Sequence, residues 1–334
     1  MKRTLLAGLL VFVMVQEGCK KDDGAGNPAG PNVPTYPVSA IVRNPSGQAQ
    51  GGALLALKNP PYASAIFSAF TDSTGKATVQ APEGPQTLVA TIGSAFRAEL
   101  PVTVAASQTG TSAGSITLQQ NTAVKVLVVK ASAEQLEDVL RDPKIGFTTF
   151  DTTYIFALRD SATVDSTKLL NFLKQYTLIF SDCDGGTEGS SSYALLSRTY
   201  GRYIQAGGKM YGGHYNYYHL QRIWSTYYDT YDYQGSTSTD SISIVDVNLS
   251  RYVGFSVAKW ISTDSRRLSG YEKFSDLPTS TKVYGVIKGT SPPVGVIAEN
   301  YSGTGKYLWT DYHNQDIKND PQLIKLVQYF LYSL

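Results

Sequence analysis

The hydrophobic pattern of this chain changes its period near residue 122, and this change constrains the fold more than any other feature. Before it, short apolar runs alternate with turn sequences such as Asn44-Pro45-Ser46-Gly47 and Asp72-Ser73-Thr74-Gly75. About seven short strands separated by such turns are typical of a β-sandwich, which we predict over residues 36–120. The expected strands are Val38–Val42, Ala53–Leu57, Ala65–Phe67, Lys76–Val79, Thr87–Ala90, Ala98–Val104 and Gly114–Leu118.

From residue 122 to residue 334, apolar strands alternate with amphipathic helices. The expected strands are 124–129, 146–150, 178–182, 209–213, 283–287, 294–298 and 306–310, and the expected helices include 133–141 with Ser132 as N-cap, 193–205 closed by Gly207-Gly208, and a last helix that starts at Asp320 and Pro321. This alternation predicts an open, mostly parallel sheet with helices on both faces, an α/β domain of three layers.

The first domain contains the segment Thr71–Val79, which is followed by Pro82 and the strand Thr87–Ala90. This order resembles the carboxypeptidase regulatory-like (transthyretin-like) domains, in which a hairpin of this composition precedes a short strand. The resemblance implies an immunoglobulin- or transthyretin-like β-sandwich that acts as a non-catalytic spacer or adhesion unit.

Three segments of the second domain carry another resemblance, namely 176–182, 203–211 and 305–314. A strand, an acidic residue, a Gly-rich loop, a helix, Ala206-Gly207-Gly208 and a further strand follow one another. This succession resembles the class I glutamine amidotransferase-like superfamily, including its non-catalytic and trehalose-utilisation-type members. The resemblance implies a flavodoxin-like fold.

The residues that carry the chemistry of that superfamily are incomplete here. Its catalytic members place a Cys in a G-x-C-x-G turn after the A-G-G strand, but this chain has Gly212-Gly213-His214-Tyr215-Asn216. Their F-H-P-E segment corresponds to Tyr312-His313-Asn314-Gln315, in which Gln replaces the carboxylate. Without a thiol at the turn, amide hydrolysis has no nucleophile, so we predict no amidotransferase activity.

Three residues are nevertheless candidates for chemistry: His313, His214 and Asp182. In this fold both imidazoles would follow sheet strands at the face where ligands bind, and two His with a carboxylate could hold a metal ion. The alternative is that the imidazoles bond to each other or to the backbone in an inactive cleft. We expect neither a bound metal nor a cofactor, a structural role for His219, and a buried packing role for Cys183.

The segment Tyr211–Tyr233 contains eight of the 23 tyrosines together with Trp224. Aromatic side chains with few rotatable bonds suit the recognition of sugars or protein surfaces. We therefore name Tyr215, Tyr217, Tyr218 and Trp224 as candidate ligand-binding residues. The alternative is an ordinary, partly buried insertion.

The N-terminal residues predict export and a lipid anchor. A basic start and the apolar run Leu5–Val15 resemble a lipoprotein signal peptide over residues 1–18, which would make Cys19 the lipidated residue. Residues 19–35 are rich in Pro, Gly and Asn and predict a flexible tether. Lys20 resembles the outer-membrane sorting class, and the acidic pair after it resembles export signals for the cell surface.

Together these patterns predict a non-catalytic lipoprotein of the cell envelope, which is anchored in the outer membrane, is exposed on the cell surface, and binds a glycan, a peptide or a protein partner. Two alternatives remain: a metal-assisted or His-dependent hydrolase of envelope or extracellular material, and a structural envelope component. The formal net charge of +2 gives no basis for nucleic-acid binding.

Overall fold

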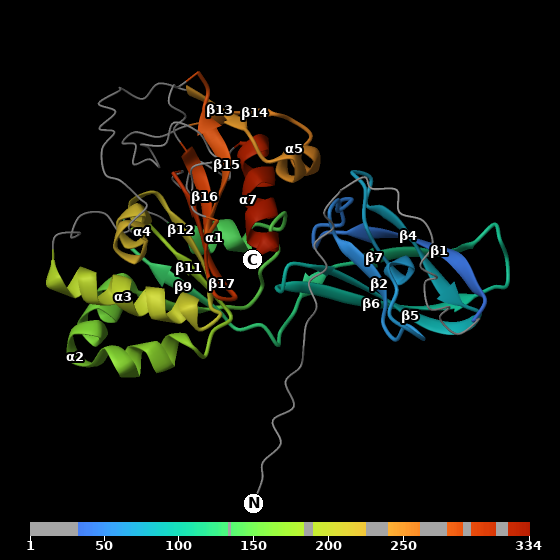
Figure 1. The fold of residues 1–334 in the computed structure, drawn as a ribbon, viewed down its shortest axis with the longest axis horizontal. Helices are drawn as coiled ribbons and strands as arrows, with labels where there is room; N and C mark the ends of the chain where they lie inside the picture. The colour runs from blue at the N-terminus through green and yellow to red at the C-terminus, as the bar shows by residue number, and fades with distance from the viewer. Residues whose placement is uncertain are drawn as a thin grey trace, which may run out of the picture. The chain divides into compact units, whose positions relative to one another are not determined.

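The computed structural model describes residues 33–132, 135–183, 190–224, 240–260, 279–289, 295–311 and 320–334. Residues 35–120 form two β-sheets whose inward-facing side chains share a core (Figure 1). One sheet contains β1 (Thr35–Arg43), β4 (Lys76–Pro82) and β7 (Thr111–Thr117). The other contains β2 (Leu54–Leu57), β3 (Ser68–Phe70), β5 (Gly84–Ile92), β6 (Phe96–Val104) and β8 (Gln119–Gln120). Val38, Ala40 and Val42 of β1 are buried at every second position, as a half-buried strand requires.

One expected strand is absent from the first domain. Residues Ala65–Phe67 form a short 3-10 helix, η1, and β3 begins only at Ser68. The hydroxyl of Ser64 accepts a hydrogen bond from the amide of Ile66 at 3.4 Å. This local bond competes with an extended backbone, so the apolar run becomes a turn in place of a strand.

A nine-stranded mixed sheet forms the centre of the second domain. Its strands are β9 (Val126–Lys130), β10 (Asp151–Tyr154), β11 (Leu178–Ser181), β12 (Lys209–Gly213), β13 (Asp240–Ile244), β14 (Val257–Trp260), β15 (Thr281–Ile287), β16 (Gly295–Ser302) and β17 (Gly305–Thr310). The order is β10-β9-β11-β12-β17-β16-β15-β13-β14. The strands from β10 to β17 are parallel, and those from β17 to β14 pair antiparallel.

The prediction of a mostly parallel sheet therefore describes only half of the strand pairs. The connection between β16 and β17 consists of Gly303 and Thr304 alone, and two residues can join only antiparallel neighbours. The strand expected at 146–150 lies a few residues later, at Asp151–Tyr154. Gly146 has φ = +85°, which interrupts an extended run there.

Helices cover both faces of this sheet. They are α1 (Leu136–Arg141), α2 (Ile155–Leu173), α3 (Ser191–Gln205), α4 (Tyr217–Ile223), α5 (Val247–Val253) and α7 (Pro321–Ser333). Leu127 and Val129 of β9 belong to a core cluster with residues of α2, α3 and α4, whereas Val126 and Val128 belong to a cluster with α1 and α7. None of the described helices is long and apolar enough to cross a membrane.

The predicted capping residues are found at the start of α7 and at the end of α3, but not at the start of α1. Asp320 caps α7 by accepting bonds from the amides of Gln322 and Leu323, with Pro321 in the first turn. Gly207, at φ = +97°, follows the end of α3. The expected cap Ser132 is wrong, because α1 begins at Leu136 without a cap from its own segment.

Aromatic contacts join the two domains within the compact unit Pro34–Leu334. The ring of Phe96 in β6 lies 4.9 Å from the rings of both Phe147 and Tyr332, in edge-to-face geometry. The hydroxyl of Ser94 donates to the carbonyl oxygen of Leu334 at 3.1 Å. The two-sheet domain of residues 35–120 is therefore packed against α7 through a shared apolar core.

Gly305, at the start of β17, offers a test of how closely this strand packs against the end of α3. A Cβ there would overlap the carbonyl oxygen of Ile204 and lie 2.6 Å from that of Gly208. We expect Gly305→Ala to lower the free energy of unfolding by about 3 kcal/mol, the upper end of overpacking penalties, because backbone must move. Urea denaturation measures this change.

The matched control is Gly201→Ala in α3, where a Cβ would meet Ile223 at an ordinary 3.4 Å. Because Ala favours helix over Gly by roughly 0.5–1 kcal/mol, this variant should be as stable as the parent or more so. Equal losses in the two variants would contradict the packing described for β17.

Candidate functional site

The candidate site lies where the parallel strands end. β11 is followed by Asp182 and Cys183, β12 by His214, and β17 by Asp311. In open α/β sheets, ligands bind outside the carboxyl ends of the strands. The topology therefore brings together residues that are far apart in the chain.

A thiol, an imidazole and a carboxylate approach one another at this edge. The Sγ of Cys183 lies 3.5 Å from Nδ1 of His214, and Nε2 of His214 lies 3.9 Å from Oδ1 of Asp311. The first distance is a hydrogen-bond contact to sulfur, and the second is longer than a hydrogen bond. All three residues have a relative exposure of 0%. The structure thus pairs His214 with Cys183 and Asp311, an association that the sequence analysis did not foresee.

His214 occupies a strained turn directly after β12. Its φ is +35°, the sole positive value among the described residues other than glycine. Such a conformation costs free energy and persists only where surrounding contacts enforce it. Here Nε1 of Trp309 donates to the His214 carbonyl oxygen at 2.9 Å. These contacts therefore hold a buried imidazole in the turn directly after β12.

Asp182 has a structural role. Its Oδ1 accepts a hydrogen bond from the Leu136 amide at 2.9 Å, and its Oδ2 accepts one from the Ala131 amide at 3.2 Å. The carboxylate therefore supplies the cap that α1 lacks within its own segment, and a negative charge at a helix N-terminus is favourable. A general acid or base needs an oxygen directed at a substrate, whereas both oxygens of Asp182 face backbone amides.

The side chain of Asn216 links the ends of β11 and β12. Its Nδ2 donates to the carbonyl oxygens of Asp182, Gly213 and Ser181 at 2.7, 3.0 and 3.3 Å, while its Oδ1 accepts from the Tyr307 hydroxyl at 3.1 Å. A Cβ at Gly212 would lie 2.7 Å from Cβ of Asn216. Gly212 is therefore required for Asn216 to reach these carbonyls.

The four aromatic candidates do not form a flat exposed patch. Tyr217 and Tyr218 are 1% and 7% exposed, and Tyr215 and Trp224 are half-buried. The ring of Tyr217 lies 5.4 Å from that of Trp309, and the ring of Trp224 lies 6.4 Å from that of Tyr307. Because the first turn of α4 packs onto the sheet, the rings of Tyr217 and Tyr218 are buried, which corrects the expectation that both are exposed for binding. The binding role of Tyr215 and Trp224 stays a prediction.

His219 is buried beside this cluster, in agreement with its expected structural role. Its ring stacks on Tyr193 at 4.3 Å, and its Nδ1 lies 2.8 Å from Oγ of Ser197. The same hydroxyl donates to the Tyr193 carbonyl at 2.9 Å, so Ser197 links the ring of His219 to the backbone of α3. Burial, aided by the charges of Arg222 and Arg159, lowers the pKa of His219 to about 3.

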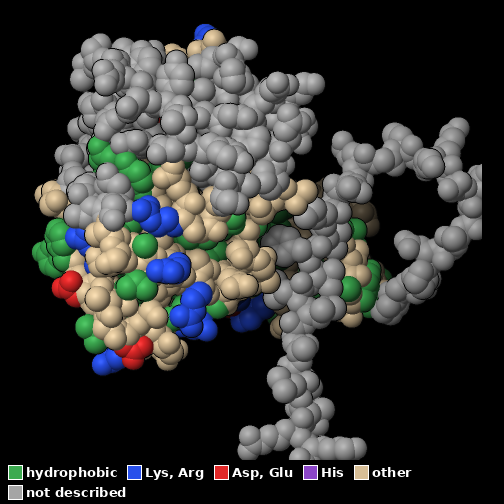
Figure 2. All heavy atoms as spheres, turned by 60° about the vertical axis from the view of Figure 1, so that its left-hand side comes forward, with side chains coloured by type: hydrophobic (Ala, Val, Ile, Leu, Met, Phe, Trp, Pro, Cys, Tyr) green, Lys and Arg blue, Asp and Glu red, His purple; other side chains and the backbone are tan. Residues whose placement is uncertain are grey.

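Two candidates of the sequence analysis lie outside the described residues: His313 and Cys19. Among the residues that are described, no three His, Cys, Asp or Glu side chains are grouped so that they could hold a metal ion. On the described part of the face in Figure 2, Lys and Arg side chains are dispersed among other side chains and form no continuous basic surface.

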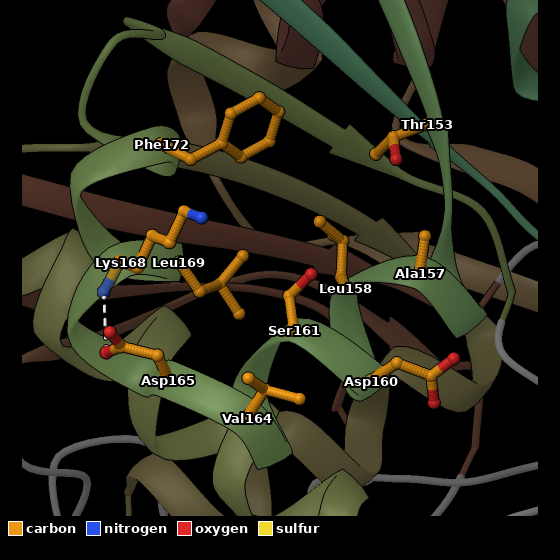
Figure 3. Close-up of a pocket in the computed structure, with 10 residues that line it drawn as sticks. All are labelled: Thr153, Ala157, Leu158, Asp160, Ser161, Val164, Asp165, Lys168, Leu169 and Phe172. Atoms are coloured by element: carbon orange, nitrogen blue, oxygen red, sulfur yellow. Dashed lines mark hydrogen bonds between the residues drawn. The ribbon is translucent and has the colours of Figure 1, made fainter.

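A separate hollow of about 460 Å³ lies on α2, on a face that the sequence analysis did not mark (Figure 3). The helix is interrupted at Asp165, which has φ = −157° and whose carboxylate caps the amides of Thr167 and Lys168. The two halves diverge around Leu158, Leu169 and Phe172. The sequence signal was the Asp-Ser-Thr run within the helix, which is a capping pattern.

The burial of His219 predicts a pH dependence of stability. Its pKa is lower in the folded protein, about 3, than in the unfolded chain, about 6.5, so acid protonates the unfolded state first. Stability from this group is complete above pH 6.5 and falls by about 1.4 kcal/mol per unit as the pH drops toward 3. Urea denaturation at several pH values should show a shallower decline in His219→Phe.

Ser197→Ala serves as the control, because it removes the hydrogen bond but keeps the imidazole and should therefore retain the decline. Equal slopes in the parent chain and in His219→Phe would show that His219 is not held neutral.

Comparisons with known proteins were made at three levels. No protein-family model and no curated protein matches the chain. Solved structures with a similar fold include a cytoplasmic protein from Salmonella typhimurium (13% identity, 62% of this chain and 98% of that chain, TM-score 0.43), a ThuA-like protein from Bacteroides uniformis (10%, 63% and 91%, 0.40) and a glutamine amidotransferase from Thermotoga maritima (13%, 63% and 97%, 0.41).

Proposed function

We propose that this chain is a non-catalytic lipoprotein of the cell envelope whose folded domains bind a glycan, a peptide or a protein partner. The observation that carries the proposal is the closure of the carboxyl edge. Cys183, His214 and Asp311 have no exposed surface, and Asp182 and Asn216 are bonded to backbone groups. A substrate would have to displace these internal bonds before it reached any of the side chains.

The order of groups at the edge also supports a non-catalytic role. An acyl-transfer site needs its nucleophile at an accessible, strained turn with the base beside it. Here the strained turn carries the base, His214, and the thiol follows the neighbouring strand β11. A carbonyl carbon attacked by this thiol would therefore have to reach Cys183, which has no exposed surface.

The fold classes of the two domains and the position of the anchor are part of the same proposal. The strands β10-β9-β11-β12-β17 stand in chain order 2-1-3-4-5, which supports assignment to the flavodoxin-like class. The two sheets of residues 35–120 support a carboxypeptidase regulatory-like sandwich that serves as a spacer. We place the anchor at Cys19 and the protein at the outer membrane, exposed on the cell surface.

One observation favours a second candidate, a His-dependent hydrolase. A thiol, an imidazole and a carboxylate follow one another in space at this edge, which is the arrangement used by cysteine hydrolases. They belong to Cys183, His214 and Asp311. In that case the thiol of Cys183 would be the nucleophile and His214 its base. Opening of the edge would be needed to admit a substrate.

Thiol reactivity distinguishes the two candidates. The chain has two cysteines, so in Cys19→Ser the thiol of Cys183 stands alone. If the edge is closed, iodoacetamide should alkylate the native protein at least about 100-fold more slowly than the guanidinium-unfolded chain, which corresponds to an opening free energy of roughly 2.8 kcal/mol. Native alkylation faster than in the unfolded chain, and lost in His214→Gln, would instead support the hydrolase.

The anchor is tested by metabolic labelling with a fatty-acid analogue in a bacterial host that processes lipoproteins. We expect the parent chain to be labelled and to sediment with membranes, whereas Cys19→Ser should carry no label because it has no thiol to acylate. Cys183→Ser is the matched control and should remain labelled. Label retained in Cys19→Ser would contradict the anchor.

A further inference from the structure

A cavity of about 610 Å³ lies at the junction of the two domains, within the compact unit Pro34–Leu334. Its walls come from the loops before and after the hairpin strands of the sandwich and from the helices α5 and α7. The volume lies within the usual range of small-molecule sites, roughly 300–1,000 Å³. The proposed function requires a binding surface, and the carboxyl edge does not provide one, so this cavity is the next place to consider.

Three aromatic side chains line the cavity: Phe70, Tyr252 and Tyr329. Phe70 is 72% exposed, which is unusual for a ring of its size. The rings of Tyr252 and Tyr329 lie 5.1 Å apart. The cavity therefore offers one exposed ring and two half-buried rings.

Contacts across the junction hold this arrangement in place. Nε2 of Gln50 donates to the Tyr252 hydroxyl at 2.8 Å, and the Thr71 hydroxyl donates to the Gln50 carbonyl at 2.6 Å. A Cβ on Gly52, whose φ is +71°, would lie 3.2 Å from the ring of Tyr252. Because these groups belong to both domains, the cavity is formed before a ligand arrives, which reduces the entropic cost of binding.

Besides the buried Thr71, whose hydroxyl is bonded to Gln50, the polar side chains of the described lining are those of Asp72, Ser73 and Asn248, all exposed. Oδ1 of Asp72 accepts bonds from the Thr74 hydroxyl and from the amides of Lys76 and Thr74. These bonds, that of Thr74 foremost, hold the pKa of Asp72 below its usual value, so it is charged at neutral pH. Asp72 is an acceptor, whereas the Asn248 amide and the Ser73 hydroxyl both donate and accept.

We propose that this cavity binds a neutral carbohydrate, with sugar rings packed on Phe70 and the tyrosines and with hydroxyls bonded to Asp72, Asn248 and Ser73. The inference rests on the proposed binding function and specifies its ligand. Sugar rings present an apolar C–H face and rim hydroxyls that donate and accept, and they match aromatic rings beside mixed polar groups. Asp72 is the one charged residue of the described lining, so phosphates and carboxylates would be repelled.

Calorimetric titration of the full chain with cellohexaose, maltohexaose, mannohexaose and xylohexaose tests the proposal. We expect at least one of them to bind, and Phe70→Ala and Asn248→Ala to weaken that binding about tenfold or more. Both side chains are exposed, so the variants should fold. Phe156→Ala, which removes a 52% exposed ring from α2, is the matched control and should bind like the parent.

The outcomes separate the two proposals. Binding that Phe70→Ala and Asn248→Ala leave unchanged would overturn the cavity as the site while leaving a glycan-binding function intact. No binding of any hexasaccharide, with tight binding of tetramethylammonium that is lost in Asp72→Asn, would overturn the carbohydrate assignment in favour of a cationic ligand. If none of these probes binds and the thiol of Cys183 is hyperreactive, the binding function itself fails.

Discussion

The closed edge depends on one constraint, the need to satisfy backbone groups where parallel strands end inside the protein. A buried amide or carbonyl without a partner costs as much as a lost hydrogen bond or more. Asp182 bonds the amides of Ala131 and Leu136, and Asn216 bonds the carbonyls of Ser181, Asp182 and Gly213. Two side chains thus join the ends of β9, β11 and β12. Because these polar groups are bonded to the backbone of the strand ends, they close the edge.

The contacts that close the edge also explain how the backbone of His214 stays in a strained conformation. Its carbonyl is bonded by Trp309, its ring contacts Cys183, and Gly212 beside it leaves room for Asn216. Each contact comes from a different strand, so the sheet as a whole holds the turn. The strain is therefore maintained by contacts within the fold itself.

Local signals predicted much of the fold. Lys209–Gly213 forms the expected strand, and Asp320 with Pro321 begins the last helix, because alternation and capping depend on neighbours in the chain. The η1 turn and the break at Asp165 were missed, since each depends on one side-chain bond that outweighs the periodic pattern. The candidate site was harder to predict from the sequence. Cys183 and His214 are 31 residues apart. The succession of β11, α3 and β12 indicates neighbouring parallel strands, but it does not indicate that these two side chains are in contact. Burial of Tyr217 and Tyr218 likewise depends on how α4 packs onto the sheet, which composition does not indicate.

The distribution of aromatic residues then relates the two domains to each other. In the second domain, tyrosines after β12 are used to cover the sheet, so a tyrosine-rich segment there is a signal of packing. At the junction, Tyr252 and Tyr329 extend the shared core to the surface, and Phe70 stands at its rim with most of its ring in water. A large ring left exposed beside a preformed cavity has an energetic cost that a bound partner would relieve. The proposed binding cavity thus rests on the exposure of an aromatic ring, and not on the density of aromatic residues along the chain.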